Sequence, residues 1–517
     1  MLPLAGRWKL SIYEYGLSVK GKCRFYLLLL VALPALGAGS QALYVSNQAC
    51  AGCHADIYRR YAPTPMANSS GRNLQPLTPG SFVHAASQVH YEINRDGAVK
   101  LSKGTARDMR RLSYFFGSGA AGRSFGYVRD GFLYEAPVTW YTQTGAWDVS
   151  PGYQSDTVSR WSRPVDPSCL FCHASQPRWR EGTVNGYADP AFDQDGIGCE
   201  RCHGPGFLHV QGKAKMVNPG SLSPPLRDSV CSQCHLTGQS RVARAGRRIE
   251  DYRPGEALSD FVAVFVPVNS SGFQVNSHVE KLAESGCKRA AGDRMWCGTC
   301  HDPHTTPAAS ERAVWYRSKC LTCHETSQCN RGFDCTTCHM PKNRAADANH
   351  GVFTDHSIPR IPGGVRNQSA ASWRLRGFAP ADRGERELGL AYAEVGVRTG
   401  DKNQQEEAIR LLSGKGDAEA QVRLADLEER AGNPKQAAAL YQSALREDAN
   451  SVIAMVNLGR LYGSSGLLDE AIRLWREALK RDPCLAEAGA NLQIALRAKK
   501  DNEGAEKVRR GQQFCSF

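Results

Sequence analysis

Hydrophobic residues follow two different periods in this chain. In the first third, residues 89–94 alternate between apolar and polar side chains, and residues 132–141 are rich in aromatic and β-branched residues. The sequence Arg95-Asp96-Gly97 follows the first of these segments and is typical of a turn, so we expect a small β element here. Beyond residue 371 the apolar positions follow a longer repeat of 34 residues, which is typical of stacked helix pairs.

The 34-residue shift superposes matching residue types in two successive segments. The aligned pairs are Leu424 with Leu458, Leu427 with Leu461, Gly432 with Gly466, Ala437 with Ala471, Leu440 with Leu474, Tyr441 with Trp475, Ala444 with Ala478 and Asp448 with Asp482. This is the period and the small/large pattern of the tetratricopeptide (TPR) repeat. A poorer copy precedes it at about 387–416, and a degenerate copy continues through Leu492, Ala505 and Val508. Residues 371–517 are therefore predicted to form an α-solenoid that docks a protein or peptide, with an irregular helical bundle as the alternative.

An apolar run from about Phe25 to Leu36 lies near the start of the chain. Basic residues precede it and the small residues 37–40 follow it, which is the order found in a secretory signal. The run is too short for a comfortable membrane span, and no later stretch approaches that length. We expect residues 1–42 to be a signal peptide and the protein to be periplasmic or otherwise exported, with a retained membrane anchor as the alternative.

Seven Cys-x-x-Cys-His motifs lie between these regions, and every Cys-x-x-Cys in the chain is followed by His. This is the attachment signature of c-type haem, in which two thiols bind the porphyrin covalently and the imidazole binds its iron. Zinc ribbons or a disulfide framework give no reason for a His after every pair. In chain order, the predicted haem-attaching cysteines are Cys50 and Cys53, Cys169 and Cys172, Cys199 and Cys202, Cys231 and Cys234, Cys297 and Cys300, Cys320 and Cys323, and Cys335 and Cys338. The proximal iron ligands are His54, His173, His203, His235, His301, His324 and His339.

Seven further histidines equal the number of second ligands that seven irons would need. They are His84, His90, His209, His278, His304, His350 and His356, and each is a candidate distal ligand, with a surface or hydrogen-bonded core role as the alternative. His209 and His304 follow the proximal ligands His203 and His301 too closely to bind the same iron from its other face. They are therefore expected to bind the iron of a neighbouring haem.

The haem-bearing segment has too little chain for an ordinary core around each ring. Residues 43–370 provide about 47 residues for each of seven haems, so the porphyrins themselves must supply the core. The expected fold class is mainly α: a haem-packed domain at 43–370, with little regular structure and a small β element, followed by the TPR solenoid.

The basic charge has a simple explanation in such a domain. The chain carries a net +13, of which residues 1–42 contribute +4 and residues 371–517 about +1, leaving about +8 in the haem-bearing segment. Because each haem brings two propionates, this excess is most simply their counter-charge. Nucleic acid is therefore not expected as a partner.

Several motifs resemble those of the cytochrome c-552/4 type of multihaem cytochrome. The segment 198–210 resembles the third-haem region of that family, and residues 47–58 look like its first haem. Cys300-His301-Asp302-Pro303-His304, residues 338–342 and Thr354-Asp355-His356 match patterns that recur in these cytochromes. The resemblance implies that His209, His304 and His356 are distal ligands. The chain departs from the family in having seven motifs rather than four and in its TPR tail, so the family's partnership with hydroxylamine oxidoreductase is not implied.

Three functions fit these features. The first is electron transfer between periplasmic redox partner proteins through seven covalent haems c, with no catalytic residues and with the TPR segment docking a protein. The second is a multihaem reductase or oxidase of a nitrogen or sulfur compound with one open haem. The third is a structural role in a conductive scaffold. Among the remaining cysteines, Cys287 and Cys329 are expected either to pair or to stay free, and Cys484 and Cys515 are expected to have no role.

Overall fold

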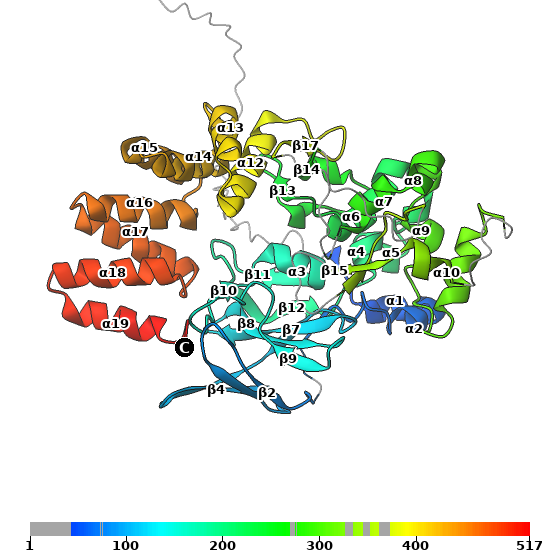
Figure 1. Ribbon diagram of the computed structural model, residues 1–517, viewed down its shortest axis with the longest axis horizontal. Helices are drawn as coiled ribbons and strands as arrows, with labels where there is room; N and C mark the ends of the chain where they lie inside the picture. Colours follow the sequence, from blue (N-terminus) through cyan, green and yellow to red (C-terminus); the bar gives the residue numbers. More distant parts are fainter. Residues whose placement is uncertain are drawn as a thin grey trace, which may run out of the picture. The chain divides into compact units, whose positions relative to one another are not determined.

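The segment between the first two motifs is a substantial β region rather than a small element (Figure 1). One sheet is the meander β2 (Gly80–Val83), β3 (His90–Ile93), β4 (Ala98–Lys103) and β5 (Ala106–Arg111). The other has the order β1 (Ser70–Gly71), β6 (Tyr114–Phe116), β7 (Gly122–Arg129), β8 (Phe132–Tyr141) and β10 (Arg163–Pro164), and β9 (Ala146–Asp148) also pairs with β8. The computed structural model describes residues 43–72, 74, 76–268, 275, 277–325, 334–344, 352–360 and 373–517. The predicted signal peptide and the boundary at 370 lie outside them.

The alternation of apolar and polar residues in the sequence determines which side chains of these strands are buried. Tyr91 and Ile93 on β3 are buried between partly exposed neighbours, and Gly97 makes the following turn with a φ of +80°. Residues 132–141 form the single strand β8, whose apolar side chains share a core with those of β3 and β4. The two segments were predicted correctly as strands. The extent of the sheets was underestimated, because β5, β6 and β7 are short or basic and alternate weakly.

Short helices carry most of the motif cysteines, and further short helices and small sheets lie between the motifs in the chain. The helices are α1 (Asn47–Cys53), α2 (Ala55–Tyr61), α3 (Pro167–His173), α4 (Glu200–His203), α5 (Phe207–Val210), α6 (Pro224–His235), α7 (His278–Glu284), α8 (Gly286–Ala291), α9 (Cys297–Cys300), α10 (Arg312–Cys320) and α11 (Cys335–His339). The antiparallel strand sets are β11 (Ser175–Trp179) with β12 (Tyr187–Gln194), β15 (Lys342–Arg344) with β16 (Val352–Thr354), and β13 (Ser240–Ala243), β14 (Val262–Pro267) and β17 (Leu375–Gly377).

The C-terminal region consists of helix pairs, as the 34-residue repeat predicts (Figure 1). The pairs are α12 (Glu385–Thr399) with α13 (Lys402–Leu412), α14 (Ala418–Arg430) with α15 (Pro434–Glu447), α16 (Val452–Ser464) with α17 (Leu468–Arg481), and α18 (Ala486–Ala498) with α19 (Asn502–Gln512). Gly432 and Gly466 end the first helices of two pairs at φ of +90° and +81°, a conformation that favours glycine. A β-carbon at Gly459 would lie 2.7 Å from Nε1 of Trp475, so glycine is needed for the close helix approach.

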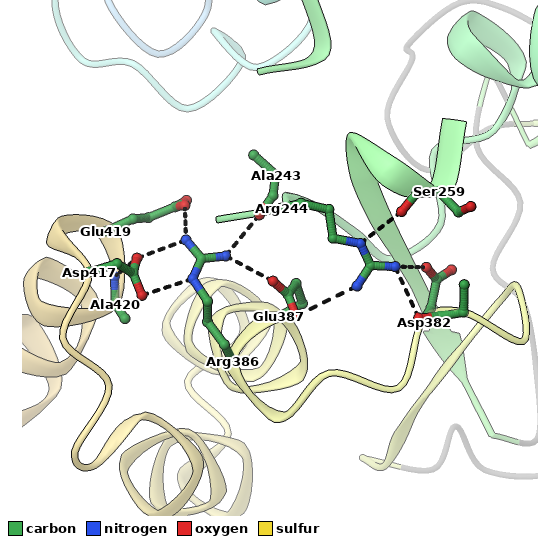
Figure 2. A network of polar contacts seen from close by, with 10 residues as sticks. Ala243, Arg244, Ser259, Asp382, Arg386, Glu387, Asp417, Glu419 and Ala420 are labelled. Atoms are coloured by element: carbon green, nitrogen blue, oxygen red, sulfur yellow. Dashed lines mark hydrogen bonds and ion pairs between the residues drawn. The ribbon is translucent and has the colours of Figure 1, made fainter. Parts of the chain in front are cut away.

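The first helix pair is joined to the haem-bearing segment by a network of two arginines (Figure 2). Arg244 follows β13 and binds the Asp382 carboxylate at 2.8 Å and the carbonyl of Ser259 at 2.8 Å. Arg386, on α12, binds the two Asp417 oxygens at 2.8 and 2.9 Å and the carbonyl of Ala243 at 2.9 Å. Apolar side chains of β13, β14 and α12 pack in one cluster beside this network. The helix pairs are therefore not a freely tethered arm at this end.

The last helix pair also contacts the β region. Ser159 and Phe517 exchange two backbone hydrogen bonds of 2.8 and 3.0 Å, and Trp161 N donates to the carbonyl of Cys515 at 2.8 Å. The buried Tyr134 hydroxyl donates to Asp482 at 2.8 Å. A disulfide between Cys484 and Cys515 encloses α18 and α19, so the expectation that these cysteines have no role was wrong. Their sequence context, polar and distant from any motif, carries no signal for the pairing.

Residues Leu43–Phe517 form one compact unit by their internal contacts. Within the described residues, we find no helix of the length and apolar character needed to cross a membrane.

Candidate functional site

A single continuous cavity of about 3580 Å³ is lined by residues of all seven Cys-x-x-Cys-His motifs. It is several times larger than the about 300–1,000 Å³ of an ordinary small-molecule pocket. All seven motif histidines line it, together with His209, His278, His304 and His356. The structure thus brings together motifs that are up to 285 positions apart in the chain, from Cys50 to Cys335.

Four of the helices around this cavity lack a side-chain core of their own. None of the residues of α1, α9, α10 or α11 is buried, although Cys50, Tyr316 and Cys335 on these helices line the cavity. Helices of this length are stable only when a tertiary contact covers one face. Bulky apolar groups attached to the motif cysteines would supply that contact. The site therefore fits covalent porphyrins acting as the core.

Three pairs of imidazole rings are spaced for binding one iron from both faces. The ring centroids of His54 and His209 lie 6.3 Å apart, those of His203 and His304 5.9 Å, and those of His301 and His356 6.2 Å. Because an imidazole nitrogen lies about 2.0–2.1 Å from a first-row metal such as zinc, two rings on opposite faces of one ion have centroids about 6–6.5 Å apart. The first two pairs are also nearly parallel, with interplanar angles of 14° and 12°.

His278 belongs to a closer group of rings. Its centroid lies 5.0 Å from that of His235 and 4.7 Å from that of His356, with the ring planes steeply inclined. These distances are shorter than two ligands of one ion require. The structure thus places His278 beside the fourth motif without the spacing that the other three pairs have.

Backbone carbonyls orient several of these rings. The Nδ1 atoms of four imidazoles lie within hydrogen-bond distance of a carbonyl oxygen: His203 with Val217 at 2.8 Å, His209 with Ala214 at 3.1 Å, His339 with Pro359 at 2.8 Å and His356 with Thr354 at 3.1 Å. A ring that donates from Nδ1 keeps the lone pair of Nε2 available for a metal. Sequence analysis did not identify these acceptors, because any residue type supplies a carbonyl.

Burial favours the neutral form of five cavity imidazoles. Desolvation is the main cause that lowers the pKa of His173, His235, His301, His304 and His356 below the usual value. Neutral imidazole is the form that binds a metal. The Nδ1 atoms of His173 and His235 are buried without a hydrogen-bond partner among the described residues, as in a site shaped around a further group.

Thiol contacts show which motifs are neighbours. The neighbouring Cys199 thiol lowers the pKa of Cys50 to about 7. Thiols influence each other's pKa in the same way in the pairs Cys172 with Cys234, Cys231 with Cys297 and Cys320 with Cys335. The motifs are therefore adjacent as first with third, second with fourth, fourth with fifth, and sixth with seventh.

His84 and His90 lie away from the cavity, on β2–β3, and neither lines it. His84 is buried, with Nδ1 2.9 Å from the Ser87 hydroxyl and Nε2 3.0 Å from the carbonyl of Gln154. Both of its nitrogens are thus engaged by protein groups, which argues against the expectation that it binds iron. His350, and Cys329 of the possible Cys287–Cys329 pair, lie outside the described residues.

The second motif faces residues that the sequence did not point to. His173 lies 6.5 Å from the ring of Phe116, and the cavity wall near it includes Ser124 and Thr139, whose hydroxyls are 2.8 Å apart. Glu135 and Arg163, paired at 2.9 Å across neighbouring strands, also line the cavity. Only the packing of β7, β8 and β10 brings them to the cavity.

Comparisons with known proteins identify two segments. A family model described as "Cytochrome c554 and c-prime" matches residues 150–204, which contain the second and third motifs. A family model described as "Tetratricopeptide repeat" matches residues 429–493. No curated protein matches the chain. The chain therefore has a cytochrome c554-like segment, which indicates covalently bound haem c, and a TPR region, which is a module for protein or peptide docking.

Solved structures that match this chain include two that each cover 24% of it. The crystal structure of MamA is 21% identical and covers 24% of this chain and 75% of its own, with a TM-score of 0.22. YrrB, described as a TPR protein with an unusual peptide-binding site, is 23% identical and covers 24% of this chain and 66% of its own, with a TM-score of 0.21.

Proposed function

We propose that this protein is an exported multihaem cytochrome that carries electrons between redox partner proteins through seven covalently attached haems c. The observation that carries the proposal is the single cavity onto which all seven motifs open. The adjacency of the motif thiols implies haems close enough for electrons to pass from one to the next. The disulfide between Cys484 and Cys515 supports an oxidising compartment such as the periplasm.

In this proposal the chain positions each ring and holds its iron. The motif cysteines attach the porphyrins and the motif histidines bind the irons, which supply one-electron chemistry when the haems are attached. His209 is the second ligand for the iron of the first motif, His304 for that of the third and His356 for that of the fifth. The bonds to Val217, Ala214 and Thr354 fix the ring orientations that this needs.

Replacing His209 tests the ligand assignment. In the holoprotein, His209→Ala is expected to convert about one of the haems from low spin to high spin, because His54 then has no opposing imidazole. Electron paramagnetic resonance measures this change. The matched control is His84→Ala, which removes an imidazole outside the cavity and should leave the spin states unchanged. Equal spectra for the two variants, or a haem content well below seven by mass spectrometry, would contradict the proposal.

A second candidate function, a multihaem oxidoreductase with an open iron, is favoured by the count of imidazoles. Four of the spare histidines line the cavity, and His84 and His90 do not. Even if His350 also reaches an iron, two of seven irons would need a ligand other than histidine. The polar wall of Ser124, Thr139 and Glu135 near His173 makes the second motif the best place for such an iron.

Carbon monoxide distinguishes the two candidates. If the protein is an oxidoreductase with an open iron, optical spectra of the dithionite-reduced holoprotein should change on adding carbon monoxide by an amount corresponding to one or two haems in seven, because open or weakly ligated ferrous iron binds this gas. Absence of any change would mean that every iron holds two tight ligands, and would leave electron transfer as the proposed function.

A further inference from the structure

Arg201, in the middle of the third motif, carries a charge that no Asp or Glu side chain among the described residues balances. Its guanidinium lies 4.2 Å over the ring of Phe171 and donates from one NH₂ group to the carbonyl of Ala174 at 3.4 Å. Its Nε is buried without a hydrogen-bond partner, and burial lowers the pKa of the side chain. Throughout the described residues, no carboxylate lies within ion-pair distance of this guanidinium. Such a buried, unpaired cation is costly and therefore calls for a role.

Arg241, on β13, is a second arginine without an ion pair among the described residues, and Gln233 lies between it and Arg201. Arg241 donates to the carbonyl of Gln233 at 2.9 Å, and the Gln233 amide donates to the carbonyl of Arg201 at 3.1 Å. The Nε of Arg241 is also buried without a hydrogen-bond partner. This guanidinium, too, has no ion pair within the part of the chain that the structure describes.

Both guanidinium groups lie where the second and fourth motifs meet. Arg201 contacts Phe171 and Ala174, which flank Cys172 and His173 of the second motif. Arg241 donates to the carbonyl of Gln233, next to Cys234 of the fourth motif, and the Cys172 thiol lies 3.9 Å from the same oxygen. Of the other arginines that line the cavity, Arg163 is balanced by Glu135 at 2.9 Å. Arg289, Arg294, Arg312 and Arg360 are exposed to solvent, which screens their charge.

We infer that Arg201 and Arg241 raise the reduction potentials of the haems attached to the second and fourth motifs, so that these two collect electrons from the others. The inference rests on the proposed haem attachment and deepens the proposed function by giving electron flow a direction. A fixed positive charge in a low-dielectric interior stabilises the state with one electron more, since that electron lowers the local charge by one. Each one-electron reduction at this pair oxidises a neighbouring haem by one electron, and a redox partner protein replaces that electron.

Potentiometric titration of the holoprotein, followed by haem absorbance, tests the inference with Arg201→Gln and Arg241→Gln. Arg241→Gln is expected to shift the high-potential part of the titration, about two-sevenths of the total, toward lower potential. Arg201→Gln should shift the same part and, because Arg201 lies within the third motif, should also lower the potential of that motif's haem. The oxidised-to-reduced ratio of that part should rise at least tenfold at a given potential, which is about 59 mV for a one-electron couple. Arg201→Lys keeps the charge and should retain most of the wild-type curve. Arg241 lies outside every motif, so its variant tests the charge even if Arg201→Gln impairs haem attachment.

The matched control is Arg178→Gln, which removes the same charge from a half-exposed side chain paired with Asp193 at 3.6 Å. It should leave the curve in place. The inference would be overturned if the titration curve of Arg241→Gln superposed on that of the wild type or shifted no more than that of Arg178→Gln. Seven attached haems would still support the proposed function in that case. A wild-type protein that lacks haem at the second and fourth motifs would instead overturn the proposed function itself.

Discussion

Removing the disulfide by the double substitution Cys484→Ala and Cys515→Ala is expected to lower the free energy of unfolding by about 3–4 kcal/mol, the value for a loop of this size. The two cysteines are 31 positions apart and their bond encloses the last helix pair. Both are buried in the core that they share with Phe125, Tyr134 and Trp161, so the larger part of the effect should appear where that helix pair meets the β region. Urea unfolding followed by far-ultraviolet circular dichroism measures the change.

The control for this experiment is Ser516→Ala, because Ser516 lies in the same tail but is exposed and pairs with Arg160 only through its backbone. It should unfold at the wild-type urea concentration. If the double variant did the same, the disulfide would not stabilise the attachment of the tail. Mass spectrometry without reductant should show two fewer hydrogens in the wild type than after reduction, which tests the bond independently.

The helical repeats could be predicted from the sequence because their register depends on local packing. Leu424 and Leu458, or Tyr441 and Trp475, occupy equivalent positions in successive helix pairs and are buried as predicted, apart from small differences in exposure. The sequence did not predict how the two ends of the repeat region attach to the rest of the chain. It depends on Arg244, Arg386 and the tail residues Cys515 and Phe517, which look like ordinary surface residues in the sequence.

For the candidate site, the motifs identified the chemistry but not the neighbourhoods. Cys-x-x-Cys-His is a local pattern, so candidate attachment residues could be predicted from the sequence alone. Which imidazole faces which motif depends on loops far apart in the chain, such as the 155 positions between His54 and His209. The equal numbers of spare histidines and motifs suggested that each spare histidine serves one motif. The fold instead places His84 and His90 in a β hairpin away from the cavity. The carbonyls that orient His203 and His209 carry no residue-type signal.

Replacing Arg244 by methionine is expected to destabilise the protein by about 3–5 kcal/mol, the range for breaking a buried ion pair by removing one partner. Arg244 binds Asp382 at 2.8 Å, and the Asp382 side chain is only 3% exposed. Asp382 also accepts hydrogen bonds from the backbone amides of Val264 and Ala379, at 3.2 and 3.0 Å. Without Arg244 this carboxylate stays buried beside Glu387 with no cation so close to it, and β14 and the start of α12 lose their common anchor.

The destabilisation should depend on pH in a defined direction. Burial raises the pKa of Asp382 above its usual value, and the positive charge of Arg244 opposes that shift. In Arg244→Met the folded-state pKa is therefore higher still, so the folded state binds a proton more readily than the unfolded state. The deficit relative to wild type is then largest near neutral pH and shrinks as the pH falls toward about 4, where the unfolded carboxyl also becomes protonated. Urea midpoints at several pH values measure it.

Two further variants show whether the lost charge balance is the cause. Arg244→Met combined with Asp382→Asn removes the uncompensated charge but keeps an oxygen that accepts from Val264 and Ala379, so it should recover most of the stability and lose the pH dependence. Lys415→Ala removes an exposed partner of Glu385, paired at 3.1 Å, and should cost no more than about 1 kcal/mol. A double variant as unstable as Arg244→Met would mean that the packing of the arginine side chain, rather than its charge, anchors the repeats.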